Sequence, residues 1–212
     1  MAAERKSHWE QIYRTRAPTE LSWHQTSLDT SCELIAATGV SPAAPILDVG
    51  AGASLLVDTL LEAGFSDLTV LDIAPAALQR VRERLGAKAE SVMFVEADVT
   101  DFRPSRRFAL WHDRAVFHFL TDPADRRRYR LTLTRALQSG GHVIIATFAL
   151  TGPTCCSGLD VVGYSAATLA AELGEGLALV ESFTQTHITP AGREQQFLYC
   201  RFRARPVGGR HG

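Results

Sequence analysis

Three acidic residues follow short apolar runs at positions where they could hold a ligand. Asp48 opens a turn that contains Gly50 and Gly52, and two glycines let a backbone bend sharply and approach a ligand without a Cβ in the way. Asp72 follows about twenty residues beyond the glycines, where a carboxylate can accept both hydroxyls of a ribose. Asp98 comes after a third apolar run, within reach of the exocyclic amine of an adenine. The set predicts a nucleoside site.

The elements that must position these acids alternate along the chain. Strands are expected at 46–49, 68–73, 92–95, 108–111 and 143–148, with helices at 54–63, 76–85, 123–137 and 166–173. Such alternation requires a parallel sheet covered on both faces, with its ligand beyond the carboxyl ends of the strands. Residues 177–187 and 195–203 are expected to add an antiparallel hairpin. We therefore predict an α/β fold, a doubly wound, seven-stranded, mostly parallel sheet with a C-terminal antiparallel hairpin.

The amino-acid composition limits the classes of protein to which the chain can belong. The 212 residues are 46% hydrophobic and carry a formal net charge of −1, which suits one domain at 1–204 and argues against a nucleic-acid-coating protein. Residues 205–212 are expected to form a flexible tail. There is no secretory h-region and no apolar run of bilayer length, so neither secretion nor a membrane partner is expected. The four cysteines lack zinc-ligand spacing; we expect reduced thiols, no metal and a cytoplasmic location.

The acids and glycines together resemble the class I S-adenosylmethionine (SAM)-dependent methyltransferases, strongly over residues 45–150. The resemblance implies a Rossmann-like methyltransferase fold with SAM as cofactor and S-adenosylhomocysteine as product. It implies that Asp48 lies near the methionine amine, that Asp72 holds the ribose and that Asp98 addresses adenine. It further implies cofactor contacts at Gly50, Gly52, Ala53, Ile73 and Val99. A dinucleotide enzyme is disfavoured, because Leu55 stands where its fingerprint requires a third glycine or alanine.

The N-terminal segments HWEQIY and LSWH resemble the opening of the tellurite-resistance, thiopurine and elongation-factor lysine methyltransferase groups. In those groups the segment folds over the cofactor, so residues 1–44 are expected to form a helical cap. Tyr13 and Trp23 are the candidates for aromatic contact with the sulfonium, since a desolvated cation gains from an aromatic face. The alternative is that these rings, with Trp9, only attach the cap to the sheet.

The segment WHDRAVFH follows the fourth strand and supplies the candidates for catalysis. Asp113 and His118 are expected to contact the cofactor or the acceptor, although His118 could equally pack a helix, and His112 is expected to cap the strand end. An Asn/Asp-Pro-Pro-Tyr element is absent, which argues against a base-flipping DNA methyltransferase. The loop with Cys155 and Cys156 is expected to form a pocket wall.

Three functions remain after these observations. The first is methyl transfer from SAM to a small-molecule nucleophile, a thiol, chalcogen or carboxylate, because the chain carries no appended recognition domain. The second is protein lysine methylation, which the N-terminal resemblance also fits. The third is SAM binding without catalysis, which the complete set of acids and glycines disfavours.

Overall fold

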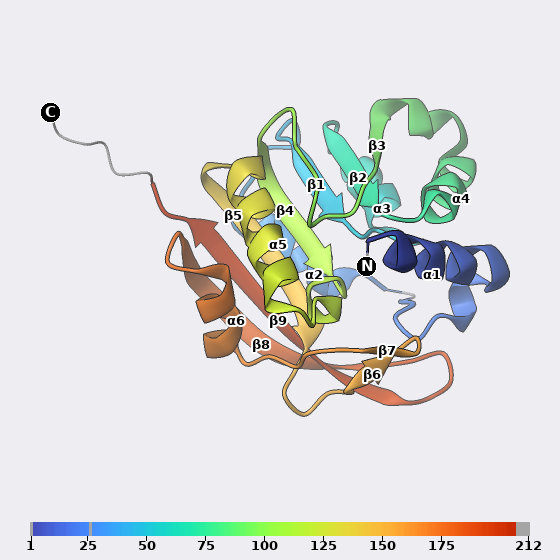
Figure 1. Cartoon of the computed structure of the whole chain (residues 1–212). Coiled ribbons are helices and arrows are strands. Elements are labelled where there is room, and N and C mark those ends of the chain that lie inside the picture. The colour runs from blue at the N-terminus through green and yellow to red at the C-terminus, as the bar shows by residue number, and fades with distance from the viewer. Residues whose placement is uncertain (1, 26, 207–212) are drawn as a thin grey trace, which may run out of the picture.

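The computed structural model describes residues 2–25 and 27–206, and strands and helices alternate along most of them (Figure 1). The strands are β1 (Ile46–Val49), β2 (Leu68–Asp72), β3 (Val92–Glu96), β4 (Phe108–Arg114), β5 (Leu137–Phe148), β6 (Cys155–Cys156), β7 (Leu159–Asp160), β8 (Leu177–Ile188) and β9 (Glu194–Ala204). The α-helices are α1 (Ala2–Thr15), α2 (Asp29–Thr38), α3 (Leu56–Glu62), α4 (Pro75–Leu85), α5 (Pro123–Ala136) and α6 (Ala166–Leu173). Short 3-10 helices are η1 (Pro18–Glu20), η2 (Gly86–Ser91) and η3 (Phe117–Phe119).

Seven strands form one sheet in the order β3-β2-β1-β4-β5-β9-β8. The first five of these pair in parallel, whereas β9 runs antiparallel between β5 and β8. The chain builds outward from β1 to β3 and then returns to add β4 on the other side of β1. The switch point therefore lies between β1 and β4, where open α/β sheets bind their ligands. The predicted sheet and its hairpin are confirmed.

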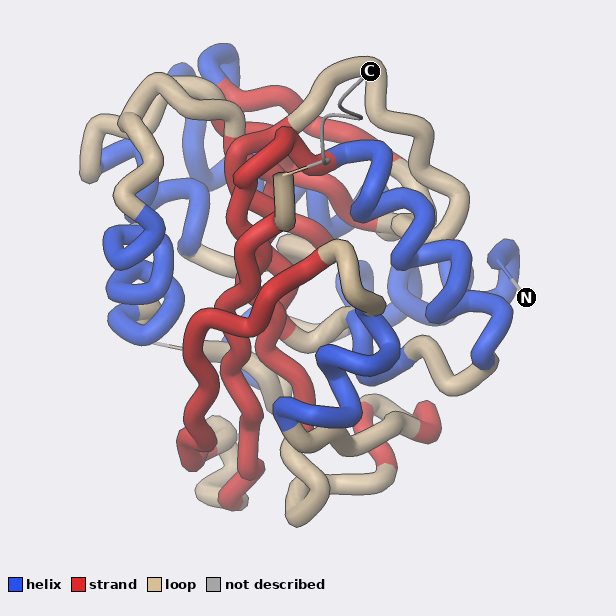
Figure 2. Tube along the Cα trace, turned by 90° about the vertical axis from the view of Figure 1, so that its left-hand side faces the viewer, coloured by secondary structure: helices blue, strands red, loops and turns tan. Residues whose placement is uncertain are grey.

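Helices lie on either side of the sheet, as Figure 2 shows. Apolar side chains form a layer on each of its two faces. One face packs against α2, α3 and α4, and the other against α5 and α6. Because both faces are covered, every residue of β1 is buried. None of the helices within residues 2–25 and 27–206 has the length and apolar character needed to cross a bilayer.

Local signals set where the helices begin and end. Pro75 occupies the first turn of α4, and Gly86 follows its end with a φ of 56°. The Asp122 side chain accepts a hydrogen bond from the backbone of Ala124 at the start of α5. Because β1 to β4 pair in parallel, their carboxyl ends meet at one edge of the sheet.

Three segments differ from the sequence prediction, and the first is the fourth strand, which was expected to end at 111 but continues to Arg114. The predicted start of the fifth strand at 143 is wrong, because β5 begins at Leu137 and continues through Gly140, whose φ is 71°. The helix before it ends at Ala136, one residue from the predicted end. The expected loop after β5 contains the small β6–β7 hairpin, which turns at Ser157 and Gly158, both with positive φ. Of the predicted tail, residues 207–212 lie outside the described residues.

Candidate active site

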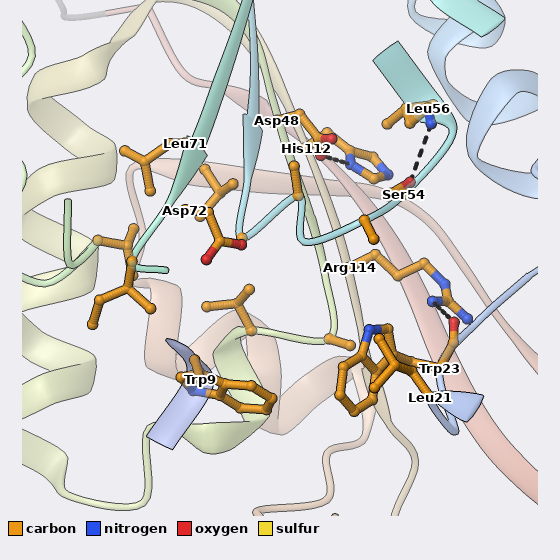
Figure 3. A pocket seen from close by; sticks show the side chains of 18 of the residues that line it. Trp9, Leu21, Trp23, Asp48, Ser54, Leu56, Leu71, Asp72, His112 and Arg114 are labelled. Carbon is orange, nitrogen blue, oxygen red and sulfur yellow. Dashed lines mark hydrogen bonds and ion pairs between the residues drawn. The ribbon is translucent and has the colours of Figure 1, made fainter. Parts of the chain in front are cut away.

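A pocket lies at the carboxyl ends of β1 to β4, between the sheet and the N-terminal segments (Figure 3). It encloses about 1240 Å³ of space, with its opening to solvent included. Nine of the residues predicted to contact a cofactor lie in its wall: Tyr13, Trp23, Asp48, Gly50, Ala53, Asp72, Ile73, Asp98 and Val99. The sequence prediction thus located the pocket, and the remaining predicted residues lie elsewhere.

Asp72 is a buried carboxylate at the end of β2, with 4% of its surface exposed. Its Oδ2 accepts the N–H of Gly52 and its Oδ1 accepts the N–H of Ala74, both at 2.8 Å. Burial raises the pKa of Asp72 to about 6, against the opposing effect of these backbone hydrogen bonds. Each carboxylate oxygen has a second lone pair, so Asp72 can still accept hydrogen bonds from ligand hydroxyls.

Asp48 is held by an imidazole that the sequence did not place in the pocket. Residue 48 on β1 stands opposite residue 112 on β4, and Asp48 Oδ1 lies 2.8 Å from His112 Nδ1. His112 Nε2 lies 3.0 Å from the hydroxyl of Ser31, from α2. A carboxylate can only accept, so Nδ1 carries the hydrogen that His112 donates to Asp48. All three residues are buried and line the pocket, which leaves Asp48 one oxygen for a ligand.

Asp98 is already paired with the N-terminal helix. Its Oδ2 accepts Arg5 Nη2 at 2.8 Å, and its Oδ1 accepts both the backbone N–H and the hydroxyl of Thr100, at 2.9 and 2.8 Å. Arg5 also pairs with Asp125 at the start of α5. A ligand amine would therefore share Asp98 Oδ2 with Arg5. No local sequence pattern points to Arg5, which lies 93 residues from its partner.

The two glycines of the turn are required by the protein itself. Gly50 has a φ of 59°, and a Cβ there would lie 2.0 Å from Val116 Cγ2. Gly52 has a φ of 56°, and its Cβ would lie 2.2 Å from the hydroxyl of Tyr13. Gly52 does not line the pocket; its N–H instead fixes Asp72. The turn is thus shaped by close contacts with η3 and α1 as well as by access to a ligand.

We expect Gly50→Ala to destabilise the fold by about 2–5 kcal/mol, as a left-handed alanine costs about 1–2 kcal/mol and overpacking about 1–3 kcal/mol. Val116→Ala removes the atom that the new Cβ would meet. Urea denaturation of both single variants and the double variant should show that the second change recovers part of the loss. Additive losses would contradict the contact.

Aromatic side chains from the N-terminal segments close the pocket opposite the sheet. The ring of Trp9 lies 5.6 Å from that of Trp23 and 4.9 Å from that of Phe119, both edge to face. Tyr13 is 5% exposed and packs beside Trp23, with 6.4 Å between ring centroids. All four rings line the pocket. The cap thus offers aromatic surface that can contact a cation or a planar group.

Trp23→Ala is expected to lower turnover more than stability, because the half-buried ring lines the pocket while its backbone carbonyl still binds Arg114. Loss of a desolvated cation–π contact, about 0.5–2 kcal/mol, corresponds to a fall of roughly 2- to 30-fold in kcat/KM. Trp23→Phe, which keeps a ring, should retain most of the activity. A matching loss of thermal stability with normal kinetics would instead assign Trp23 to packing.

Asp113 and His118, the predicted catalytic residues, do not line the pocket. Asp113 is fully buried on the other face of β4, where it accepts the hydroxyl of Tyr129 at 2.6 Å, and burial raises its pKa to about 6. His118 is also fully buried and stacks on Phe148, with ring centroids 4.4 Å apart. Burial, followed by the charge of Arg114, lowers the pKa of His118 to about 3. Neither residue reaches a ligand in this arrangement.

Comparison with known proteins agrees with this geometry. Residues 46–141 match the model of a family described as a methyltransferase domain. Residues 46–141 therefore carry a methyltransferase domain. It is 26% identical over 149 residues to the eEF1A lysine and N-terminal methyltransferase of Mus musculus, a match that covers 67% of this chain but 21% of that protein. The chain thus spans about a fifth of the length of this curated relative.

Solved methyltransferase structures share the fold over nearly the whole chain. A structure from work on the conversion of a disulfide bond into a thioacetal group during echinomycin biosynthesis has a TM-score of 0.78, with 19% identity and coverage of 96% of this chain and 94% of that chain. The N-methyltransferase NodS of Bradyrhizobium japonicum, in complex with S-adenosylhomocysteine, has a TM-score of 0.71, with 19% identity and coverage of 93% and 98%. These two neighbours thus share the fold of this chain, and the second holds S-adenosylhomocysteine.

Proposed function

We propose that the protein transfers the methyl group of SAM to a small-molecule nucleophile, a thiol, chalcogen or carboxylate. The observation that carries this proposal is the cap. Residues of α1 and of the segment from η1 to α2 form the wall of the pocket opposite the strand ends. Leu21 and Tyr13 in this wall are 2% and 5% exposed. A pocket roofed by packed side chains suits a small acceptor.

The residues in the wall fit the chemistry of the cofactor. We assign the free oxygen of Asp48 to the methionine ammonium and Asp72 to the ribose hydroxyls, since both carboxylates are buried in the pocket wall. Asp98 is assigned to the adenine amine, in competition with Arg5. Tyr13 and Trp23 supply aromatic surface for the sulfonium. This arrangement accounts for each carboxylate that lines the described pocket.

The protein's contribution to the reaction is alignment in a dry site. When bound, SAM supplies the electrophilic methyl group and a leaving thioether, and an acceptor must approach in line with the breaking bond. The apolar and aromatic wall excludes water, while the carboxylates fix one reactant; such positioning can supply several kcal/mol. Asp113 and His118 lie outside the pocket. An acceptor that ionises readily, such as a thiol, needs no strong base from the protein.

Protein lysine methylation is the alternative, and the similarity to the mouse eEF1A lysine and N-terminal methyltransferase favours it. The fold neighbour from echinomycin biosynthesis, by contrast, comes from small-molecule chemistry that involves sulfur. The two functions require different access to the methyl group of SAM. A lysine side chain on a folded protein needs an opening beside the methyl group, whereas the aromatic cap here packs over the pocket. We also propose a cytoplasmic location, where the four free cysteines stay reduced.

Isotopically labelled SAM tests the proposal. The protein is incubated with panels of thiols, amines and carboxylates, and separately with a whole-cell lysate, and the labelled products are separated by size. Label in a small-molecule product supports the proposal. Label confined to protein lysines supports the alternative, and label in neither fraction overturns both. Asp72→Ala serves as the control that should abolish labelling at low SAM concentration.

A further inference from the structure

Arg114 is the last residue of β4 and lines the pocket on the side away from Asp72 (Figure 3). Its Nη1 donates to the carbonyl oxygen of Trp23 at 2.9 Å, and its Nε donates to the hydroxyl of Tyr199 at 3.2 Å. A guanidinium has five N–H groups, so two are used and three remain. Nη2 has no partner within the described residues. The cation is therefore only partly satisfied, and its two partners are neutral.

Among the described residues, the charge of Arg114 also has no counter-ion within ion-pair distance. None of the ion pairs formed within residues 2–25 and 27–206 includes Arg114. The positive charge of Arg114 instead lowers the pKa of nearby histidine side chains. Burial lowers the pKa of His187 first, and the charge of Arg114 lowers it further. A half-buried charge without an opposite charge is costly, and proteins normally pair such groups.

The surroundings of Arg114 separate it from the nucleoside side of the pocket. The acidic side chains of the described pocket wall, Asp48, Asp72 and Asp98, belong to β1, β2 and the turn after β3. Arg114 instead reaches across β5 to β9, where its Cζ lies 4.8 Å from the ring centroid of Phe197. The nearby wall consists of Trp23, His24, Leu28 and Phe119 among others. A cofactor held by the three acids leaves the Arg114 end for the second substrate.

We propose that Arg114 recognises a negatively charged group, such as a carboxylate, on the methyl acceptor. The proposal rests on the proposed methyl transfer and narrows its substrate class to anionic small molecules. An anion in the pocket supplies the missing counter-charge, and the guanidinium suits it because charge-assisted hydrogen bonds are stronger than neutral ones. A lysine ammonium at the same place would meet a like charge without a carboxylate beside it. The proposal therefore distinguishes methylation of a small molecule from methylation of a protein lysine.

Equilibrium binding to the S-adenosylhomocysteine complex of the full chain tests this role. The probes are matched pairs that differ only in charge, benzoate with benzamide and 3-mercaptopropionate with 3-mercaptopropionamide, measured by calorimetry at neutral pH. In the wild type we expect the carboxylate of each pair to bind about tenfold or more tightly than its amide, the size of one charge-assisted hydrogen bond. Arg114→Gln should bring the ratio close to one, and Arg114→Lys should keep part of the preference.

Arg127→Gln is the matched control, because Arg127 is exposed on α5 and does not line the pocket. It should keep the wild-type ratio. An equal affinity for both members of each pair in the wild type overturns the proposal, and so does an unchanged preference in Arg114→Gln. A third overturning result is that Arg114→Gln weakens S-adenosylhomocysteine but not 5′-methylthioadenosine, which would assign Arg114 to the cofactor's own carboxylate. These binding measurements do not require methyl transfer. They therefore test the role of Arg114 separately from the labelling experiment, which tests the methyl transfer itself.

Discussion

Asp72→Asn is expected to weaken SAM binding roughly 10- to 100-fold, since a hydrogen bond to a charged group contributes about 1.5–3 kcal/mol. Both oxygens of Asp72 accept backbone N–H groups, from Gly52 and Ala74. An asparagine must turn its NH₂ group toward one of these donors, which loosens the glycine turn as well as the ribose contact. Calorimetry with S-adenosylhomocysteine measures the loss directly.

Asp67→Asn provides a matched control for this substitution. Asp67 pairs with Arg106 just before β2 begins, at the opposite end of the strand from Asp72. The substitution removes the same charge beside the other end of β2, outside the pocket wall. The Asp67→Asn variant should bind S-adenosylhomocysteine with the affinity of the wild type. If Asp72→Asn also retained normal affinity, the ribose assignment would have to be abandoned.

The raised pKa of Asp72 makes binding and stability respond to pH in opposite directions. Burial raises the pKa to about 6 in the folded chain, compared with about 4 in an unfolded one. The contribution of this group to stability is complete below about pH 4 and is lost as pH rises through about 6. Ribose binding needs the ionised carboxylate, so the Kd for SAM should rise by up to about tenfold per unit as pH falls below the folded pKa. Asp72→Asn should abolish this dependence, and a wild-type Kd unchanged between neutral and mildly acidic pH would contradict it.

The strand ends of the pocket were predictable from sequence because their signals are local. The run Ile46–Val49 is apolar throughout, its strand is buried along its length, and glycines follow it directly. The same reasoning identified Asp72 at the end of β2. Once parallel strands are assigned, their carboxyl ends must meet at one edge, so the carboxylates were expected to converge.

The partners of those carboxylates were not predictable, because they come from distant segments. His112 meets Asp48 only through the register of β1 on β4, across 64 residues of sequence. Arg5 meets Asp98 only because α1 folds back over the strand ends. No local sequence pattern indicates either pairing. A strand register is decided by which apolar faces pack together, which is a property of the whole sheet.

Strand length explains where Asp113 lies. The sequence analysis ended the fourth strand at residue 111, which left Asp113 free to turn toward the pocket. The strand continues to Arg114, so side chains alternate, with His112 and Arg114 on one face and Asp113 on the other. Asp113 consequently binds Tyr129 beneath α5. Because the predicted strand ended three residues too early, Asp113 was assigned to the pocket, whereas its neighbours His112 and Arg114 line it.

His112→Ala is expected to impair both the fold and the cofactor site. The variant leaves buried Asp48 Oδ1 and the Ser31 hydroxyl without their partner, and each unsatisfied buried group costs about 1–3 kcal/mol. We expect the free energy of unfolding to fall by about 2–6 kcal/mol and SAM affinity to fall about tenfold, as Asp48 loses its fixed orientation. Urea denaturation and calorimetry with S-adenosylhomocysteine measure the two effects separately.

Two further variants separate orientation of Asp48 from packing. In His112→Asn, the side-chain N–H can replace Nδ1 toward Asp48 but cannot extend to Ser31, so affinity should recover more than stability. Ser31→Ala removes only the outer hydrogen bond and should change affinity little. If folded His112→Ala bound S-adenosylhomocysteine with the wild-type Kd, the imidazole would be a packing residue alone. Recovery of affinity by asparagine, with stability still reduced, would show that the hydrogen bond to Asp48 is what the cofactor site requires.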